Sequence, residues 1–273
     1  MHQRSTGSAV LAAESAGDAM RIADLYQQGC AKVRLPKNHD GHGLEAVMIN
    51  TAGGITGGDK LDWRFEAGRN CKLTVTSQAC ERLYRALDDT AHIKIELAAG
   101  SNARLNWLPQ ETILFDGCRT HRSIDVALED NARLLVVEPL LFGRAAMGEK
   151  VTQGSFSDAW HIRHGGRPVH ADRLRFDGGM DRHLQGKAVA GGATALATVL
   201  ALETVSTRWL EPITDAARQI IGEAGGVSFW KIGETGKLLA RLVAEDGYTL
   251  RKRLVPLIEL LNDGAALPKS WAL

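Results

Sequence analysis

Gly68-Arg69-Asn70-Cys71-Lys72-Leu73 is the first of three similar stretches in the sequence, and the others are Gly100-Ser101-Asn102-Ala103-Arg104-Leu105 and Glu129-Asp130-Asn131-Ala132-Arg133-Leu134. Each copy has an asparagine followed by a small residue, a basic residue and a leucine. The asparagines lie 32 and 29 residues apart. Polar residues of this kind are typical of tight turns. The three copies therefore predict similar turns with a period of about 30 residues.

The segments around these turns alternate between apolar and polar residues, as in 72–77, 92–97, 124–128 and 134–137. Apolar residues at every second position predict half-buried strands. The repeating unit is then a strand, a tight polar turn, a second strand and a longer excursion, and we expect the units to stack. Chance similarity among β-hairpins is the alternative. The predicted fold is mainly β, with stacked, solenoid-like (β-helix-like) sheets.

The C-terminal part has a different pattern. Residues 214–224 carry a plausible N-cap and helix-forming residues, and they end at two glycines. Residues 227–232 and 238–243 flank a short turn and predict a β-hairpin. A second helix is expected over 248–262, and its proline should kink it or mark its start. We therefore expect a stacked β-sheet body over 1–209 and a helix–hairpin–helix segment over 210–273, packed together as one continuous structural unit.

The composition excludes several classes of protein. Lys and Arg total 33 and Asp and Glu total 32, so a net charge of +1 gives no broad basic field for binding nucleic acid. Hydrophobic residues make up 44% of the chain, which excludes a disordered protein. The longest uncharged run, 188–202, is shorter than the roughly 20 apolar residues of a membrane span. With no secretory signal and no Cys-x-x-Cys pair, we expect a cytoplasmic protein with reduced thiols.

Residues 53–60 form a glycine-rich loop that invites a phosphate-binding interpretation. A phosphate loop ends in Lys-Ser/Thr or opens a helix, whereas this loop contains an aspartate and is followed by an alternating strand pattern. We expect a hairpin connection or a bulge instead. The three histidines His161, His164 and His170 lie close in sequence, but two of them are at an odd offset and would face opposite sides of one strand. They predict a metal site only weakly.

Five ordered motifs resemble the family of the urease accessory protein UreD, also called UreH. They are residues 50–59 (NTAGGITGGD), 76–85 (TSQACERLYR), 107–115 (WLPQETILF), 143–149 (GRAAMGE) and 267–271 (LPKSW). The triplet 172–174 (DRL) matches a sixth, shorter pattern. Cys80 and Glu81 depart from the family, which has a small residue and often a lysine there. The resemblance spans nearly the whole chain.

The resemblance implies a maturation factor that is not itself an enzyme. Proteins of this family act with UreF and the GTPase UreG to load nickel into apo-urease, and a homodimer within that complex is compatible with the family. No cofactor is expected to be bound permanently, because nickel would be in transit through an internal passage. A second, unrelated interpretation is a β-solenoid hydrolase acting on carbohydrates, with Glu111 and Asp116 as general acid and base.

A passage for a divalent ion needs oxygen ligands that hold the ion weakly and in succession. The candidate lining residues are acidic: Asp59, Glu111, Glu138, Glu149 and Asp172. The alternative for each acid is that it fixes a glycine-rich turn by accepting backbone hydrogen bonds. We expect UreF to contact the C-terminal helical region, and the candidate contact residues are Arg251, Lys252, Leu254, Leu257 and Leu261.

Overall fold

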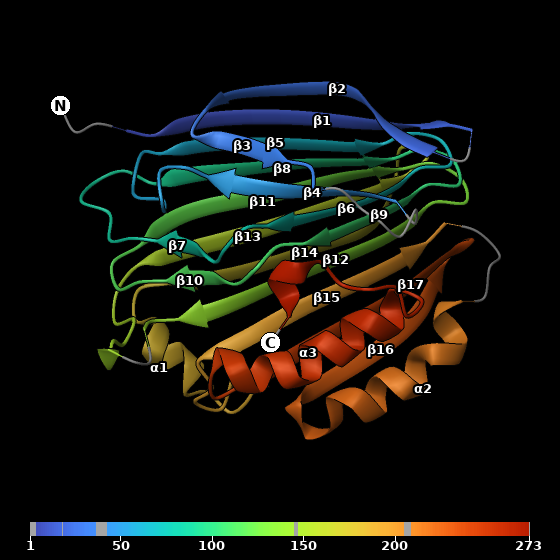
Figure 1. Cartoon of the computed structure of the whole chain (residues 1–273). Helices are drawn as coiled ribbons and strands as arrows, with labels where there is room; N and C mark the ends of the chain where they lie inside the picture. The colour runs from blue at the N-terminus through green and yellow to red at the C-terminus, as the bar shows by residue number, and fades with distance from the viewer. Residues whose placement is uncertain (1–3, 18, 37–42, 145–146, 205–208, 273) are drawn as a thin grey trace.

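The molecule consists of two facing β-sheets with helices at the C-terminal end (Figure 1). The structure is a computed structural model, and it describes residues 4–17, 19–36, 43–144, 147–204 and 209–272. The first sheet has the spatial order β14 (Arg167–Asp177), β13 (Ser155–His164), β11 (Arg119–Leu128), β8 (Ala91–Ala99), β5 (Lys60–Ala67), β1 (Thr6–Ala16) and β2 (Ala19–Gly29). The second has the order β16 (Gly225–Ile232), β17 (Thr235–Ala244), β15 (Ala195–Glu203), β12 (Arg133–Phe142), β9 (Arg104–Leu108), β6 (Lys72–Ser77), β4 (Leu44–Asn50) and β3 (Ala31–Arg34). Two short strands, β7 (Glu81–Leu83) and β10 (Thr112–Leu114), continue the second sheet beside β12.

The stacked, solenoid-like fold is confirmed. Strands β5, β8, β11 and β13 pair in parallel in the first sheet, and β4, β6, β9 and β12 pair in parallel in the second. Each repeat crosses from the first sheet to the second at a tight turn, namely between β5 and β6, β8 and β9, and β11 and β12. Parallel neighbours require such crossover connections, because a hairpin would return the chain antiparallel.

The three turns have the same backbone conformation. Asn70, Asn102 and Asn131 have φ angles of 59°, 60° and 61°, a left-handed region that asparagine tolerates better than most residues. The turns also stack, because the backbone N–H of Asn70 donates to the carbonyl of Ser101 and that of Asn102 donates to Asp130, both at 3.0 Å. The repeat seen in the sequence therefore marks the corners of the stack.

The glycine-rich loop at 51–59 is not a hairpin connection, so that expectation is wrong. The loop leaves β4 in the second sheet and enters β5 in the first. Ile55 forms an isolated parallel bridge with Leu83, the last residue of β7, and this bridge holds the loop against β7. Gly54 has φ of 153°, and a Cβ there would lie 2.2 Å from the ring of Tyr84. Glycine is required at this position by both the backbone and the neighbouring ring.

The hydrophobic residues form two cores. One lies between the sheets and includes Leu11, Phe65 and Leu105. The other lies between the second sheet and the C-terminal helices and includes Val199 and Leu254. Strand β12 contributes to both, which explains its nearly continuous run of buried residues. No helix in the described ranges combines the length and apolar character needed to cross a membrane.

The predicted helix–hairpin–helix segment is present with shifted boundaries. Helix α2 (Leu210–Ile221) begins before Thr214, so Thr214 is not its N-cap but lies inside the first turns and donates to the Leu210 carbonyl at 2.9 Å. Helix α3 (Gly247–Leu261) is capped by Asp246 and continues through Pro256, which does not mark its start. Strand β17 pairs with β15, so the second sheet continues across residue 210. A short helix, α1 (Met180–Leu184), precedes β15, and 3-10 turns follow α2 (Gly222–Ala224) and end the chain (Lys269–Trp271).

Candidate functional site

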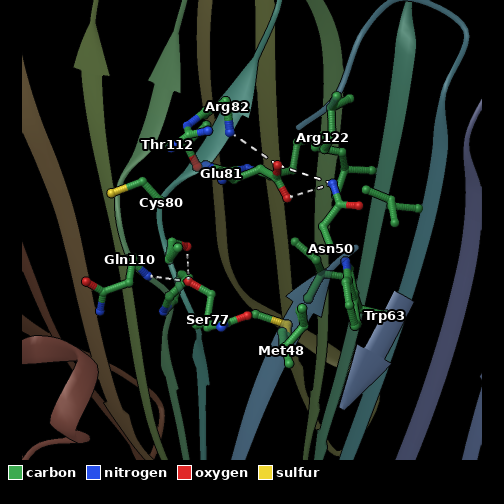
Figure 2. Close-up of a pocket in the computed structure, with 18 of the residues that line it drawn as sticks. Met48, Asn50, Trp63, Ser77, Cys80, Glu81, Arg82, Gln110, Thr112 and Arg122 are labelled. Carbon is green, nitrogen blue, oxygen red and sulfur yellow. Dashed lines mark hydrogen bonds between the residues drawn. The ribbon is translucent and has the colours of Figure 1, made fainter. Parts of the chain in front are cut away.

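A cavity of about 180 Å³ lies between the two sheets (Figure 2). Its walls come from both sheets and are largely apolar, with Leu61, Trp63 and Trp107 among the lining residues. The surface end lies beside Arg82, which is exposed. The inner end is charged: it is lined by the buried side chains of Glu138 from the second sheet and Arg122 from the first.

Arg122 joins two carboxylates at the inner end of the cavity. Its Nη1 lies 2.6 Å from Oε2 of Glu138, and its Nε and Nη2 donate to the two carboxylate oxygens of Asp158 at 3.0 and 2.7 Å. The indole N–H of Trp107 donates to the other Glu138 oxygen at 2.6 Å. The side chains of Arg122, Glu138 and Asp158 are 6%, 2% and 4% exposed. The group therefore holds two negative charges and one positive charge out of water.

A small void of about 10 Å³ lies beyond this group. Glu138 lines both the cavity and the void, and Asp158 and Asp172 line the void with it. Asp172 forms an ion pair with Arg241, and their side chains are 19% and 55% exposed, so this end reaches the surface. We call Arg122, Glu138, Asp158 and Asp172 the charged seam. It runs from the inner end of the cavity to the surface between β14 and β17.

The electrostatics of the seam follow from burial and from the uneven number of charges. Burial raises the pKa of Glu138 to about 7, the charge of Asp158 adds to this effect, and Arg122 opposes it. Burial by itself would lower the pKa of Arg122, but the two carboxylates raise it further than burial lowers it. Elsewhere in the cavity lining, burial raises the pKa of Glu81 to about 7, although Asn50 donates to both of its oxygens at 3.3 Å. The cavity lining thus carries two acids whose pKa lies near neutral pH.

The structure brings only two of the five predicted acids, Glu138 and Asp172, into the seam. Asp59 accepts backbone N–H groups from Ser5 at 2.7 Å and Thr56 at 2.8 Å, so it fixes the glycine-rich turn. Glu111 and Glu149 face other partners: Glu111 pairs with Arg251 at 2.6 Å, and Glu149 with Arg144 at 2.7 Å. These arginines lower the pKa of both carboxyl groups against the opposing effect of burial. None of Asp59, Glu111 and Glu149 is among the residues that line the cavity or the void.

The predicted partner-binding residues of α3 fall into two groups. Leu254, Leu257 and Leu261 are 0% exposed and belong to the core between α3 and the second sheet. The expectation that these leucines contact a partner is therefore corrected, because an amphipathic helix turns its apolar side inward. Arg251 is half-buried and holds Glu111, whereas Lys252 is exposed. Only Lys252 of the five offers an unobstructed surface.

The three histidines do not share a site. His161 lies 3.3 Å from Asp125, and His164 lies 2.9 Å from Asp130. His170 is buried beside Lys237, with 3.3 Å between Nδ1 and Nζ, and burial and this lysine lower its pKa to about 4. Within the described residues, no set of three or more His, Cys, Asp or Glu side chains is arranged to hold a metal ion.

The two acids of the hydrolase interpretation have structural partners. Glu111 is held by Arg251, and Asp116 forms an ion pair with Arg85 while accepting the backbone N–H groups of Thr152 and Gln153. Cys80, one of the two departures from the family pattern, contacts Glu111 at 3.4 Å, and burial raises the pKa of its thiol to about 11. These contacts tie loops and α3 to the sheets.

Sequence reasoning missed Arg122 and Asp158, although the signal was present. In β11 every second side chain points inward, as Ile124 and Val126 do, and Arg122 occupies another of these inward positions. In β13, Asp158 lies two residues after the buried Phe156 and so points to the same side of the strand. A charged residue at an inward position of an alternating strand marks a buried polar site.

The fold and the site define a β-rich protein with two stacked sheets that enclose a cavity and a charged seam. The family described as UreD urease accessory protein matches residues 5–272. The chain is 49% identical to urease accessory protein UreD 1 of Brucella anthropi, over 98% of this chain and 95% of that protein. It is 48% identical to urease accessory protein UreD of Mesorhizobium japonicum, over 99% of this chain and 95% of that protein.

The chain therefore belongs to the UreD urease accessory protein family, and the family supports a role in urease maturation. The names of these relatives describe accessory proteins of urease. The comparisons give no support to the hydrolase interpretation with Glu111 and Asp116.

Proposed function

We propose that this protein acts in the cytoplasm with UreF and the GTPase UreG to insert nickel into apo-urease, and that it conducts the ion without turnover of its own. The ion would cross the protein through the cavity and the charged seam. The observation that carries the proposal is that Glu138 lines both the cavity and the void beyond it. One buried carboxylate is thus within reach of an ion on either side.

The chemistry of the route suits transit better than storage. Carboxylate oxygens hold divalent nickel less tightly than thiolates or imidazoles do, so an ion on this route can leave again. Glu138 and Asp172 lie at successive points toward the surface, and Glu81 supplies a further carboxylate in the lining of the cavity. Nickel is the cargo in this proposal and not a resident cofactor.

The test uses the whole activation system: apo-urease, UreF, UreG, GTP and nickel. We expect Glu138→Gln and Asp172→Asn to slow the gain of urease activity several-fold, with less nickel in the urease recovered. Glu66→Gln is the matched control, because Glu66 lies on the outer side of β5 with a side chain that is 47% exposed. Activation at the parental rate in both seam variants would rule out this route.

A separate experiment tests the maturation role itself. Deletion of the gene should leave urease protein present but inactive and poor in nickel. Full urease activity and nickel content in the deletion strain would refute the role.

For the contact with UreF, we propose the exposed surface of α3 around Tyr248 and Lys252. Tyr248 is 62% exposed, and Nζ of Lys252 lies 4.3 Å from the centre of its ring. Lys252→Glu should weaken co-purification of UreF without loss of folding. Arg251 is unsuitable for this test, since its reversal would place two negative charges together at Glu111. Undiminished UreF binding by Lys252→Glu counts against this surface.

A further inference from the structure

The guanidinium of Arg122 lies between the cavity and the void. Arg122 lines the cavity, Asp158 lines the void, and Glu138 lines both. The guanidinium contacts Glu138 at 2.6 Å and both oxygens of Asp158 at 3.0 and 2.7 Å. A cation that moves from the cavity to the void therefore meets a positive group that belongs to the chain itself.

The seam carries more negative charge than is needed to join the strands. Arg122 and Asp158 already form a balanced, two-point ion pair. Glu138 adds a second carboxylate that is 2% exposed. Its Oε2 is close to Arg122, but it lies outside normal hydrogen-bond geometry for every donor in the described residues. An extra, incompletely satisfied carboxylate is unfavourable for folding, so its presence fits a site that a second cation visits.

The same two carboxylates would hold a divalent ion tightly if the guanidinium were absent. Two buried negative charges match the charge of such an ion, and the low dielectric of the interior strengthens the attraction. In the structure, the single positive charge of Arg122 already contacts both Glu138 and Asp158. An arriving ion must therefore displace the guanidinium from a carboxylate before it can bind there.

We infer that Arg122 is an affinity-determining residue, a tethered cation that competes with divalent metal ions for Glu138 and Asp158 and so prevents the seam from retaining them. The guanidinium yields one carboxylate while the ion passes and returns to it as the ion leaves. This inference rests on the proposed passage of nickel through the molecule.

Arg122→Met tests the inference with Ni²⁺ alone as the probe. Methionine has a similar length but no charge, which leaves Glu138 and Asp158 without their shared partner. We expect the purified variant to retain about one more nickel ion per chain than the parent in equilibrium dialysis, with at least roughly tenfold tighter binding. Two control variants should retain no more nickel than the parent. Arg122→Lys keeps the positive charge, and the double variant Arg122→Met/Asp158→Asn lacks one of the two carboxylates. Equal retention by Arg122→Met and the parent overturns the inference.

A second measurement covers the case in which Arg122→Met folds poorly. A ligand that binds only the folded state stabilises it, so Ni²⁺ should raise the melting temperature of Arg122→Met and not that of the parent. Arg122→Gln, which is neutral but can donate hydrogen bonds, should show the same nickel-dependent rise. Failure of both variants to fold even with Ni²⁺ present also overturns the inference, because the ion should replace the missing charge.

Urease activation separates this inference from the proposed function. If nickel crosses the seam, Arg122→Met should trap the ion and slow activation of urease. Nickel retention by Arg122→Met together with normal activation would support the role of Arg122 and refute the passage. Normal nickel retention by Arg122→Met together with impaired activation by Glu138→Gln would support the passage and refute the role of Arg122.

Discussion

Glutamine in place of Glu138 tests whether the charged seam holds an excess negative charge. In the parent, one guanidinium faces the two carboxylates of Glu138 and Asp158. Glu138→Gln leaves the pair of Arg122 and Asp158 electrically balanced. The glutamine oxygen can still accept the N–H of Trp107, whereas its amide faces Arg122 as a second donor. The donor–donor contact therefore lowers the free energy of unfolding by an amount that does not depend on pH, whereas removal of the excess charge raises it by an amount that does.

The size of the benefit follows from the pKa of Glu138, which burial raises from 4.5 to about 7. At pH values between the unfolded and folded pKa of Glu138, the folded chain binds this proton and the unfolded chain does not. The free energy of unfolding therefore falls as the pH rises through this range. From pH 5 to pH 8 the parent should lose roughly 2–3 kcal/mol through this group, at about 1.4 kcal/mol per pKa unit. Glu138→Gln has no such group and escapes the loss.

The assay is urea unfolding of the purified full chain at both pH values. We expect the free energy of unfolding of Glu138→Gln, relative to the parent, to improve by roughly 2–3 kcal/mol between pH 5 and pH 8. The fixed cost of the donor–donor contact cancels in this comparison, as do the other titrating groups. The control Glu66→Gln should show no such change, because Glu66 is partly exposed. Parallel pH dependences of Glu138→Gln and the parent would refute the reasoning.

Other substitutions test the elements that position the site. Asn102→Ala should be about 1 kcal/mol less stable in urea unfolding than Asn102→Gly, since only glycine accepts φ of 60° without a Cβ penalty; equal stabilities would contradict this account of the corners. Leu257→Ala removes a side chain that is 0% exposed beneath α3 and should lower the free energy of unfolding by about 2–5 kcal/mol, whereas a loss below about 1 kcal/mol would argue against its core position. Arg251→Ala leaves the buried carboxylate of Glu111 unpaired and should lower stability by about 3 kcal/mol, and addition of Glu111→Gln should recover part of that loss in the same assay. An undiminished loss in the double variant would show that the charge of Glu111 is not the cause.

Much of the architecture was predictable because it depends on local patterns. The asparagines at 70, 102 and 131 marked the corners of the stack, and the glycines at 233 and 236 marked the hairpin between β16 and β17. The loop at 51–59 was misjudged because a glycine-rich loop between two strands looks the same whether it returns to one sheet or crosses to another. Helix α2 begins at Leu210, before the predicted N-cap at Thr214, because its first turn is held by the buried side chain of Leu210.

The candidate site was predictable only in part. Asp172 was chosen because the family resemblance places an acid there, and Glu138 only as a further acid that could line a passage; the structure brings both to one seam. Asp59 was chosen on the same basis as Asp172 but binds backbone N–H groups instead. An acid that fixes a turn and an acid that lines a cavity have the same signature in a sequence, and they differ only in the groups that surround them.

The sequence by itself determined the strands, their corners and the side of each strand that faces inward, because alternation and turn chemistry act over a few residues. It also determined the family, through motifs in order along the chain. Only the tertiary structure decided that Arg122 meets Asp158, 36 residues away, and that Glu138 from the opposite sheet joins them. Those contacts depend on the register of stacked strands and on the facing of two sheets, which no local pattern specifies.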